Sequence, residues 1–140
     1  MFMQTVLLVS LLSGTSDACS YENDWSYISN IKDDRERYIR TLKDLDSALK
    51  KENKIFVSGM IFFPIKLNCR GNEKEINESE FASCYNNVFS KKFLRSLYVD
   101  GCLDIHISRN GVRIGKSGEI WMQDIATQNG YSLLITTINN

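Results

Sequence analysis

The sequence has little from which to build a metal site or a conventional catalytic centre. It contains one histidine, His106, and its four cysteines, Cys19, Cys69, Cys84 and Cys102, form no Cys-x-x-Cys pair. A structural zinc site needs closely spaced cysteines and histidines, so we expect neither a metal nor a cofactor. We also find no carboxylate pair, and no nucleophile with a base beside it, of the kind that acid–base or covalent catalysis uses.

An excess of charge of one sign is also missing. The chain has 17 basic and 17 acidic side chains and a formal net charge of zero with its histidine neutral. This balance gives no electrostatic reason to expect nucleic acid or an anionic membrane as a partner. Ile55–Leu67 is the longest apolar stretch outside the N-terminus, and Ser58, Gly59, Pro64 and Lys66 interrupt it, so we expect no transmembrane segment there.

The N-terminus reads as a removable export signal over residues 1–18. Val6–Leu12 is apolar apart from Ser10, which is shorter than the roughly 20 residues of a membrane-spanning helix. Small residues follow, with Ser16 and Ala18 at the two positions that signal peptidase reads before a cut after Ala18. We therefore expect residues 19–140 to form one domain that is periplasmic or secreted.

Cys19 would then be the first residue of the mature chain, which raises lipid anchoring as an alternative. The charge of Asp17 argues against a lipoprotein signal. An even number of cysteines in an oxidising compartment predicts disulfides, although four cysteines allow three pairings. We expect one bond among Cys69, Cys84 and Cys102.

Helical periodicity dominates the first part of the domain and strand periodicity the last. Apolar residues recur at steps of three, four and seven from Trp25 to Lys51, and again from Phe81 to Leu97 after an Asn77–Glu80 capping box. Residues 55–63 fit a buried strand or a short helix, and residues 68–75 read as a loop. Alternating stretches follow in the last part of the chain: Leu103 to Ile107, Val112 to Gly115, Glu119 to Ala126 and Tyr131 to Ile138, with turns at Asn110-Gly111 and Asn129-Gly130. Helices followed by an antiparallel meander predict an α+β fold.

Four short motifs between Leu42 and Trp121 resemble a group of small exported bacterial proteins in the nuclear transport factor-2-like superfamily. They are Phe63-Pro64-Ile65, the helical set Phe81, Tyr85 and Phe89, then Gly111-Val112-Arg113-Ile114-Gly115, and Gly118-Glu119-Ile120-Trp121. The resemblance implies a cone in which helices pack in a strongly curved antiparallel sheet with a concave cavity. It also implies that residues 55–63 form a short helix.

The candidate binding residues are Asp104, His106, Arg113 and Trp121, which we expect on the concave sheet face. Asp104 and His106 share one face of a strand, and Arg113 and Trp121 are cross-strand candidates. We interpret the protein as a non-enzymatic binding module of the bacterial envelope, an inhibitor or immunity-type protein. Its partner would be a protein or a small ligand, and a homodimer is compatible with the sequence.

The alternative is a small cavity enzyme, an isomerase or hydrolase. It would use Asp104 or His106 as the general base and Trp121 or Tyr131 as a wall of the cavity.

Overall fold

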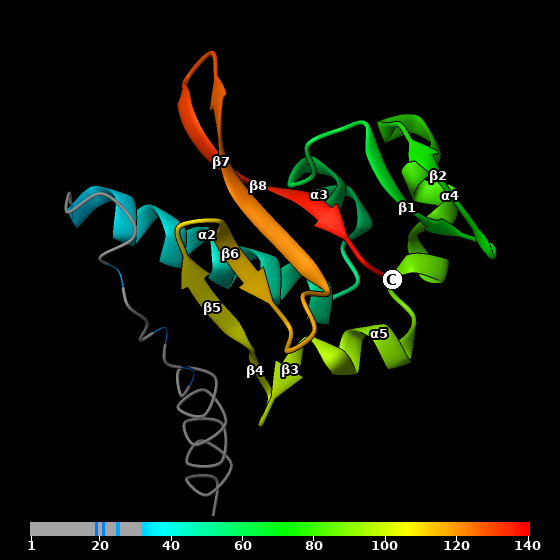
Figure 1. Cartoon of the computed structure of the whole chain (residues 1–140), viewed down its shortest axis with the longest axis horizontal. Coiled ribbons are helices and arrows are strands. Elements are labelled where there is room, and N and C mark those ends of the chain that lie inside the picture. The colour runs from blue at the N-terminus through cyan, green and yellow to red at the C-terminus, as the bar shows by residue number, and fades with distance from the viewer. Residues whose placement is uncertain (1–18, 20, 22–24, 26–31) are drawn as a thin grey trace, which may run out of the picture.

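A computed structural model of the chain describes residues 19, 21, 25 and 32–140 (Figure 1). The export signal expected at residues 1–18 lies outside the described residues. The fold is α+β, as expected. Its helices are α2 (Lys32–Lys50), α3 (Lys54–Gly59), α4 (Glu78–Val88) and α5 (Lys91–Ser96). Its strands are β1 (Ile65–Cys69), β2 (Asn72–Ile76), β3 (Tyr98–Val99), β4 (Cys102–Leu103), β5 (Ile105–Ser108), β6 (Gly111–Ile114), β7 (Ile120–Thr127) and β8 (Gly130–Ile138).

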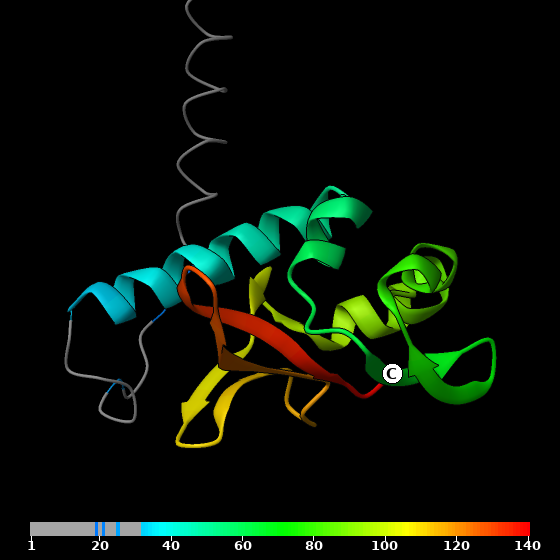
Figure 2. The same cartoon turned by 90° about the horizontal axis from the view of Figure 1, so that it is seen from above.

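The central sheet is antiparallel in the order β5-β6-β7-β8. This linear order leaves the sheet open, so it is not a closed barrel. One face is apolar because strand side chains alternate between faces. It carries the fully buried residues Val112, Ile114, Ile120, Met122 and Ile135. Helix α2 lies across this face of the sheet (Figure 2).

Helix α2 contributes an apolar stripe to the same core. Tyr38, Leu42, Leu45 and Leu49 are spaced by four, three and four residues, and all four are buried. That spacing places them on one side of a helix with 3.6 residues per turn. The helix expected from Trp25 to Lys51 thus corresponds, in its described part, to α2.

The loop expected over residues 68–75 is wrong, because this stretch belongs to a β-hairpin. Strands β1 and β2 pair from Ile65–Ile76 to Cys69–Asn72. Arg70 and Gly71 connect them with φ values of 57° and 85°, the positive pair that a tight two-residue hairpin turn requires. Strand β2 buries only its last residue, so it has no apolar alternation from which a strand could be recognised.

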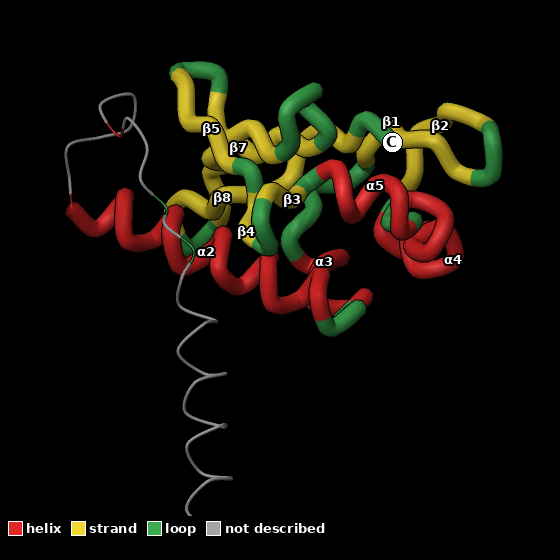
Figure 3. The backbone as a smooth tube through the Cα atoms, turned by 90° about the horizontal axis from the view of Figure 1, so that it is seen from below, coloured by secondary structure: helices red, strands yellow, loops and turns green. Residues whose placement is uncertain are grey.

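The second helical stretch is two helices instead of one. Asn77 caps α4, and the expected capping box is confirmed: Asn77 Oδ1 accepts from the Glu80 backbone N–H at 3.0 Å, and Glu80 Oε1 accepts from the Asn77 N–H at 3.5 Å. The chain breaks after α4, and Ser90 caps α5 by accepting a bond from the Phe93 N–H at 3.2 Å. The aromatic stripe hides this break because its spacing of four residues continues through it. Figure 3 shows α4 and α5 gathered beside β1 and β2 at the end of the molecule where the chain ends.

The ambiguous segment 55–63 contains both kinds of structure. Its first part lies in helix α3, as the resemblance implied. Its last residues are extended and run beside β8. There Phe62 N–H donates to Ile135 O at 2.9 Å and Ile135 N–H donates to Met60 O at 2.8 Å. These two bonds cover part of the outer edge of β8.

Two disulfides tie these parts together. Cys69 on β1 pairs with Cys84 on α4 across a Cα–Cα distance of 5.7 Å, which confirms a bond between two of the three expected cysteines. Cys102, the third of these cysteines, pairs instead with Cys19 at a Cα–Cα distance of 5.5 Å, a second bond that the sequence did not predict. Cys19 lies in a polar lead-in with no periodicity to place it. A lipid thioether would need the same sulfur, which is engaged in this bond.

Both bonds fit an oxidising compartment. Within the described residues, no helix is long and apolar enough to cross a membrane.

Candidate functional site

Three of the four candidate binding residues form one row across the sheet. The register pairs His106 of β5 with Arg113 of β6, Arg113 with Trp121 of β7, and Trp121 with Thr137 of β8. Each alternates with a buried residue of its own strand, so the row lies on the face turned away from α2. The expectation placed these residues on a concave face; in the structure they occupy the open face, opposite the one filled by the apolar core.

Asp104 joins the row at His106. Asp104 Oδ1 lies 3.0 Å from His106 Nε2. The Asp104 backbone is fixed, because its N–H donates to Leu97 O and its carbonyl accepts from the Gly115 N–H, both at 2.8 Å. The histidine side chain is 51% exposed and the aspartate only 18%. The carboxylate therefore orients the imidazole through its Nε2 atom.

Arg113 is the residue of the row that has a buried polar atom without a described hydrogen-bond partner. Its Nε is buried and has no hydrogen-bond partner among the residues that the structure describes. Gly118, at φ 74°, packs against it: a Cβ at Gly118 would lie 3.9 Å from Arg113 Cδ and 3.0 Å from Trp121 Nε1. The turn thus covers the stem of Arg113 while no described carboxylate lies within ion-pair distance of its guanidinium. A buried N–H group without an acceptor costs free energy, which a ligand that supplied an acceptor would recover.

A hollow of about 420 Å³ adjoins the row at Trp121. Amides and hydroxyls make up the rest of its lining: Asn110, Gln123, Thr136, Thr137 and Asn139. Two of the amides are already held, since Gln123 Nε2 donates to Asn110 O at 3.3 Å and Asn139 Nδ2 donates to Gly118 O at 2.7 Å. The open face therefore combines an aromatic side chain, a cation and several hydrogen-bonding groups, two of which are held in place.

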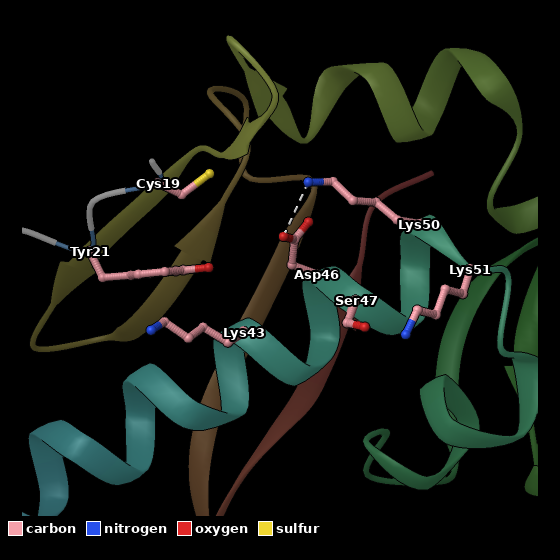
Figure 4. A pocket seen from close by; sticks show the side chains of 7 residues that line it. All are labelled: Cys19, Tyr21, Lys43, Asp46, Ser47, Lys50 and Lys51. Carbon is pink, nitrogen blue, oxygen red and sulfur yellow. Dashed lines mark hydrogen bonds and ion pairs between the residues drawn. The ribbon is translucent and has the colours of Figure 1, made fainter. Parts of the chain in front are cut away.

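A second hollow, of about 360 Å³, lies beside the Cys19–Cys102 disulfide (Figure 4). Its lining comes from the polar side of α2, from the residue that follows this helix, and from two residues near the N-terminus: Cys19, Tyr21, Lys43, Asp46, Ser47, Lys50 and Lys51. Sequence reasoning missed it. The spacing of Lys43, Ser47, Lys50 and Lys51 on one side of a helix is the available signal, and it is shared with ordinary solvated helix faces.

Asp46 is the carboxylate of this hollow and it is fully engaged. Its Oδ1 accepts from Tyr98 Oη at 2.9 Å and its Oδ2 from Lys50 Nζ at 3.3 Å. Lys50 Nζ also donates to Gly101 O at 3.1 Å. Burial raises the pKa of Tyr98, and the hydrogen bond to Asp46 raises it further. Burial and then the charge of Asp46 likewise raise the pKa of Tyr21, so both phenols stay protonated beside the carboxylate.

The described part of the chain contains no candidate metal site. No group of three or more histidine, cysteine, aspartate or glutamate side chains lies close enough there to hold a metal ion. No family model, curated protein or solved structure matches this chain.

Proposed function

We propose that the protein is an exported, non-enzymatic binding module, of the inhibitor or immunity type, that engages a partner protein through the open face of its sheet. The observation that carries this proposal is Arg113, a half-buried guanidinium without a described acceptor between His106 and Trp121. The two disulfides support export. The α+β order of elements supports membership of the nuclear transport factor-2-like superfamily, which we include in the proposal.

The chemistry of the row favours a protein over a small molecule. Tryptophan and arginine are the side chains that most often carry the binding energy of protein interfaces. Small-molecule sites, in contrast, bury most of their ligand in an enclosed cleft, and this row lies on an open sheet. A partner that offers a carboxylate to Arg113 and an apolar edge to Trp121 would satisfy both residues.

The test is affinity for a partner captured from periplasmic extract and then purified. Arg113→Gln removes the guanidinium but keeps most of the aliphatic stem and a polar end. We expect it to weaken binding at least ten-fold, since about 1.4 kcal/mol of lost interaction is a factor of ten. Arg95→Gln on α5 is the matched control, because this exposed residue belongs to a helix outside the sheet. Equal affinity of the two variants would refute the open face as the binding surface.

The Asp104–His106 contact supports a second candidate function. A carboxylate 3.0 Å from an imidazole nitrogen can orient that ring as a general base for an isomerase or hydrolase. In that case Asp104→Asn and His106→Gln would each lower kcat/KM by about 100-fold or more on a substrate found by activity screening. A binding module would show no turnover at all. The activity screen of the unmodified protein therefore distinguishes the two functions before any variant is made.

A further inference from the structure

We propose that the hollow beside the Cys19–Cys102 disulfide binds a small ligand that carries a phosphate group. The site is lined by α2, Cys19 and Tyr21, and it uses no residue of the open sheet face. It is therefore independent of the function proposed above.

The charge of the hollow is unbalanced toward the positive. Three lysines line it against one carboxylate, and Asp46 is already neutralised by Lys50 and bonded to Tyr98. Lys43 and Lys51 remain, and neither has a carboxylate within ion-pair distance among the residues that the structure describes. A ligand that brings negative charge would complete the site.

The uncharged groups in the lining fit the same ligand. Tyr21 and Ser47 add hydroxyl groups, and Asp46 has its acceptor atoms occupied. Figure 4 shows the Tyr21 oxygen directed toward Asp46, with Lys43 extending along the ring at 6.0 Å from its centroid. Lysine ammonium groups and hydroxyls surround a phosphate group well, because every one of its oxygens can accept a hydrogen bond.

The size of the site favours a ligand with more than one charged group. Lys43 and Lys51 are eight residues apart, which is about 12 Å along a helix axis. A single small ion would reach one ammonium group, whereas a diphosphate placed between the two flexible stems can meet both. Inorganic pyrophosphate is therefore the probe that we choose.

The disulfide holds one wall of this site in place. Cys19 and Tyr21 both line the hollow, and the bond from Cys19 to Cys102 fixes Cys19 beside the turn that carries Gly101. Lys50 of α2 donates to Gly101 O, so the disulfide and the helix both contact the same turn. We expect ligand affinity to depend on the intact bond.

The experiment is a calorimetric titration of the oxidised full domain with pyrophosphate. Lys43→Gln with Lys51→Gln should weaken binding at least ten-fold. The control is Lys91→Gln with Lys92→Gln, two exposed lysines on α5, because this pair changes the net charge by the same amount away from the hollow. We expect the control to bind within two-fold of the unmodified protein.

Three outcomes would overturn the proposal: no saturable binding of pyrophosphate, equal weakening in both double variants, or tighter binding of chloride than of pyrophosphate. Thermal unfolding of each variant shows that loss of binding is not loss of fold. Cys19→Ser with Cys102→Ser tests separately whether ligand affinity depends on the disulfide. Unchanged affinity in that variant would contradict the disulfide's part in the site.

Discussion

At the scale of single residues, Tyr98 couples folding to pH. Burial raises the pKa of its phenol, and the hydrogen bond to Asp46 at 2.9 Å raises it further. The unfolded chain releases this proton near pH 10, whereas the folded protein retains it at that pH. The unfolded state then binds fewer protons, so the stability that Tyr98 contributes is complete below about pH 10 and is lost as the pH rises further.

We therefore expect the free energy of unfolding to decrease above about pH 10, and to decrease less steeply in Tyr98→Phe. At pH 7 the same variant should be about 1 kcal/mol less stable, because the hydrogen bond to Asp46 is gone. Urea unfolding at several pH values measures both effects. Tyr131→Phe, at a residue that is 64% exposed, is the control. An identical alkaline slope in Tyr98→Phe and the unmodified protein would contradict the argument.

At the scale of elements, the far half of the β7–β8 hairpin stands apart from the sheet. Strand β6 pairs with β7 only from Ile120 to Met122, whereas β7 and β8 continue together to Thr127 and Gly130 (Figure 1). A two-stranded ribbon has little stability of its own. Arg37 of α2 holds it, donating to both carboxylate oxygens of Asp124 at 2.8 and 2.9 Å.

Arg37→Gln should free this ribbon from α2. We expect hydrogen exchange of amides between Asp124 and Leu133 to accelerate about five-fold, with about 1 kcal/mol lost in global stability, because the pair is two-pronged but partly exposed. Arg40→Gln, at an exposed residue of the same helix, is the control. A double-mutant cycle with Asp124→Asn isolates the pair, and a coupling energy of zero would show that the contact does not hold the ribbon.

How much of each element could be predicted depended on how regularly its apolar residues recur. The row from His106 to Trp121 was foreseeable because strand alternation and the Asn110-Gly111 turn together fix a register. The β1–β2 hairpin was missed because β2 exposes four of its five residues. The lysine hollow was missed for another reason: Cys19 is held at it by a disulfide to Cys102, 83 residues away, and no local pattern encodes that contact.

At the scale of the whole molecule, the two disulfides close loops of very different length. Cys69 and Cys84 are 15 residues apart, and Cys19 and Cys102 are 83 apart. Loop-closure entropy in the unfolded chain gives about 3 kcal/mol of stabilisation for the short loop and about 4.5 kcal/mol for the long one. A bond that closes a longer loop restricts more of the unfolded chain, so the N-terminal bond should matter more.

We expect Cys19→Ala with Cys102→Ala to lower the free energy of unfolding more than Cys69→Ala with Cys84→Ala, by about 1.5 kcal/mol. Alanine avoids placing hydroxyl groups at Cys69 and Cys84, which are buried. Chemical unfolding compares the two variants, and peptide mapping without reductant verifies the pairing. Free thiols on all four cysteines of the exported protein would contradict the disulfide framework.

The long loop also determines how the molecule responds to a protease. One cut anywhere between Cys19 and Cys102 leaves both products joined by that bond. A nicked molecule would therefore migrate as a single band on a non-reducing gel and separate into two fragments only after a thiol is added. Most of the described chain lies inside this covalent ring, and among the described residues only those after Cys102 can be released by a single cut.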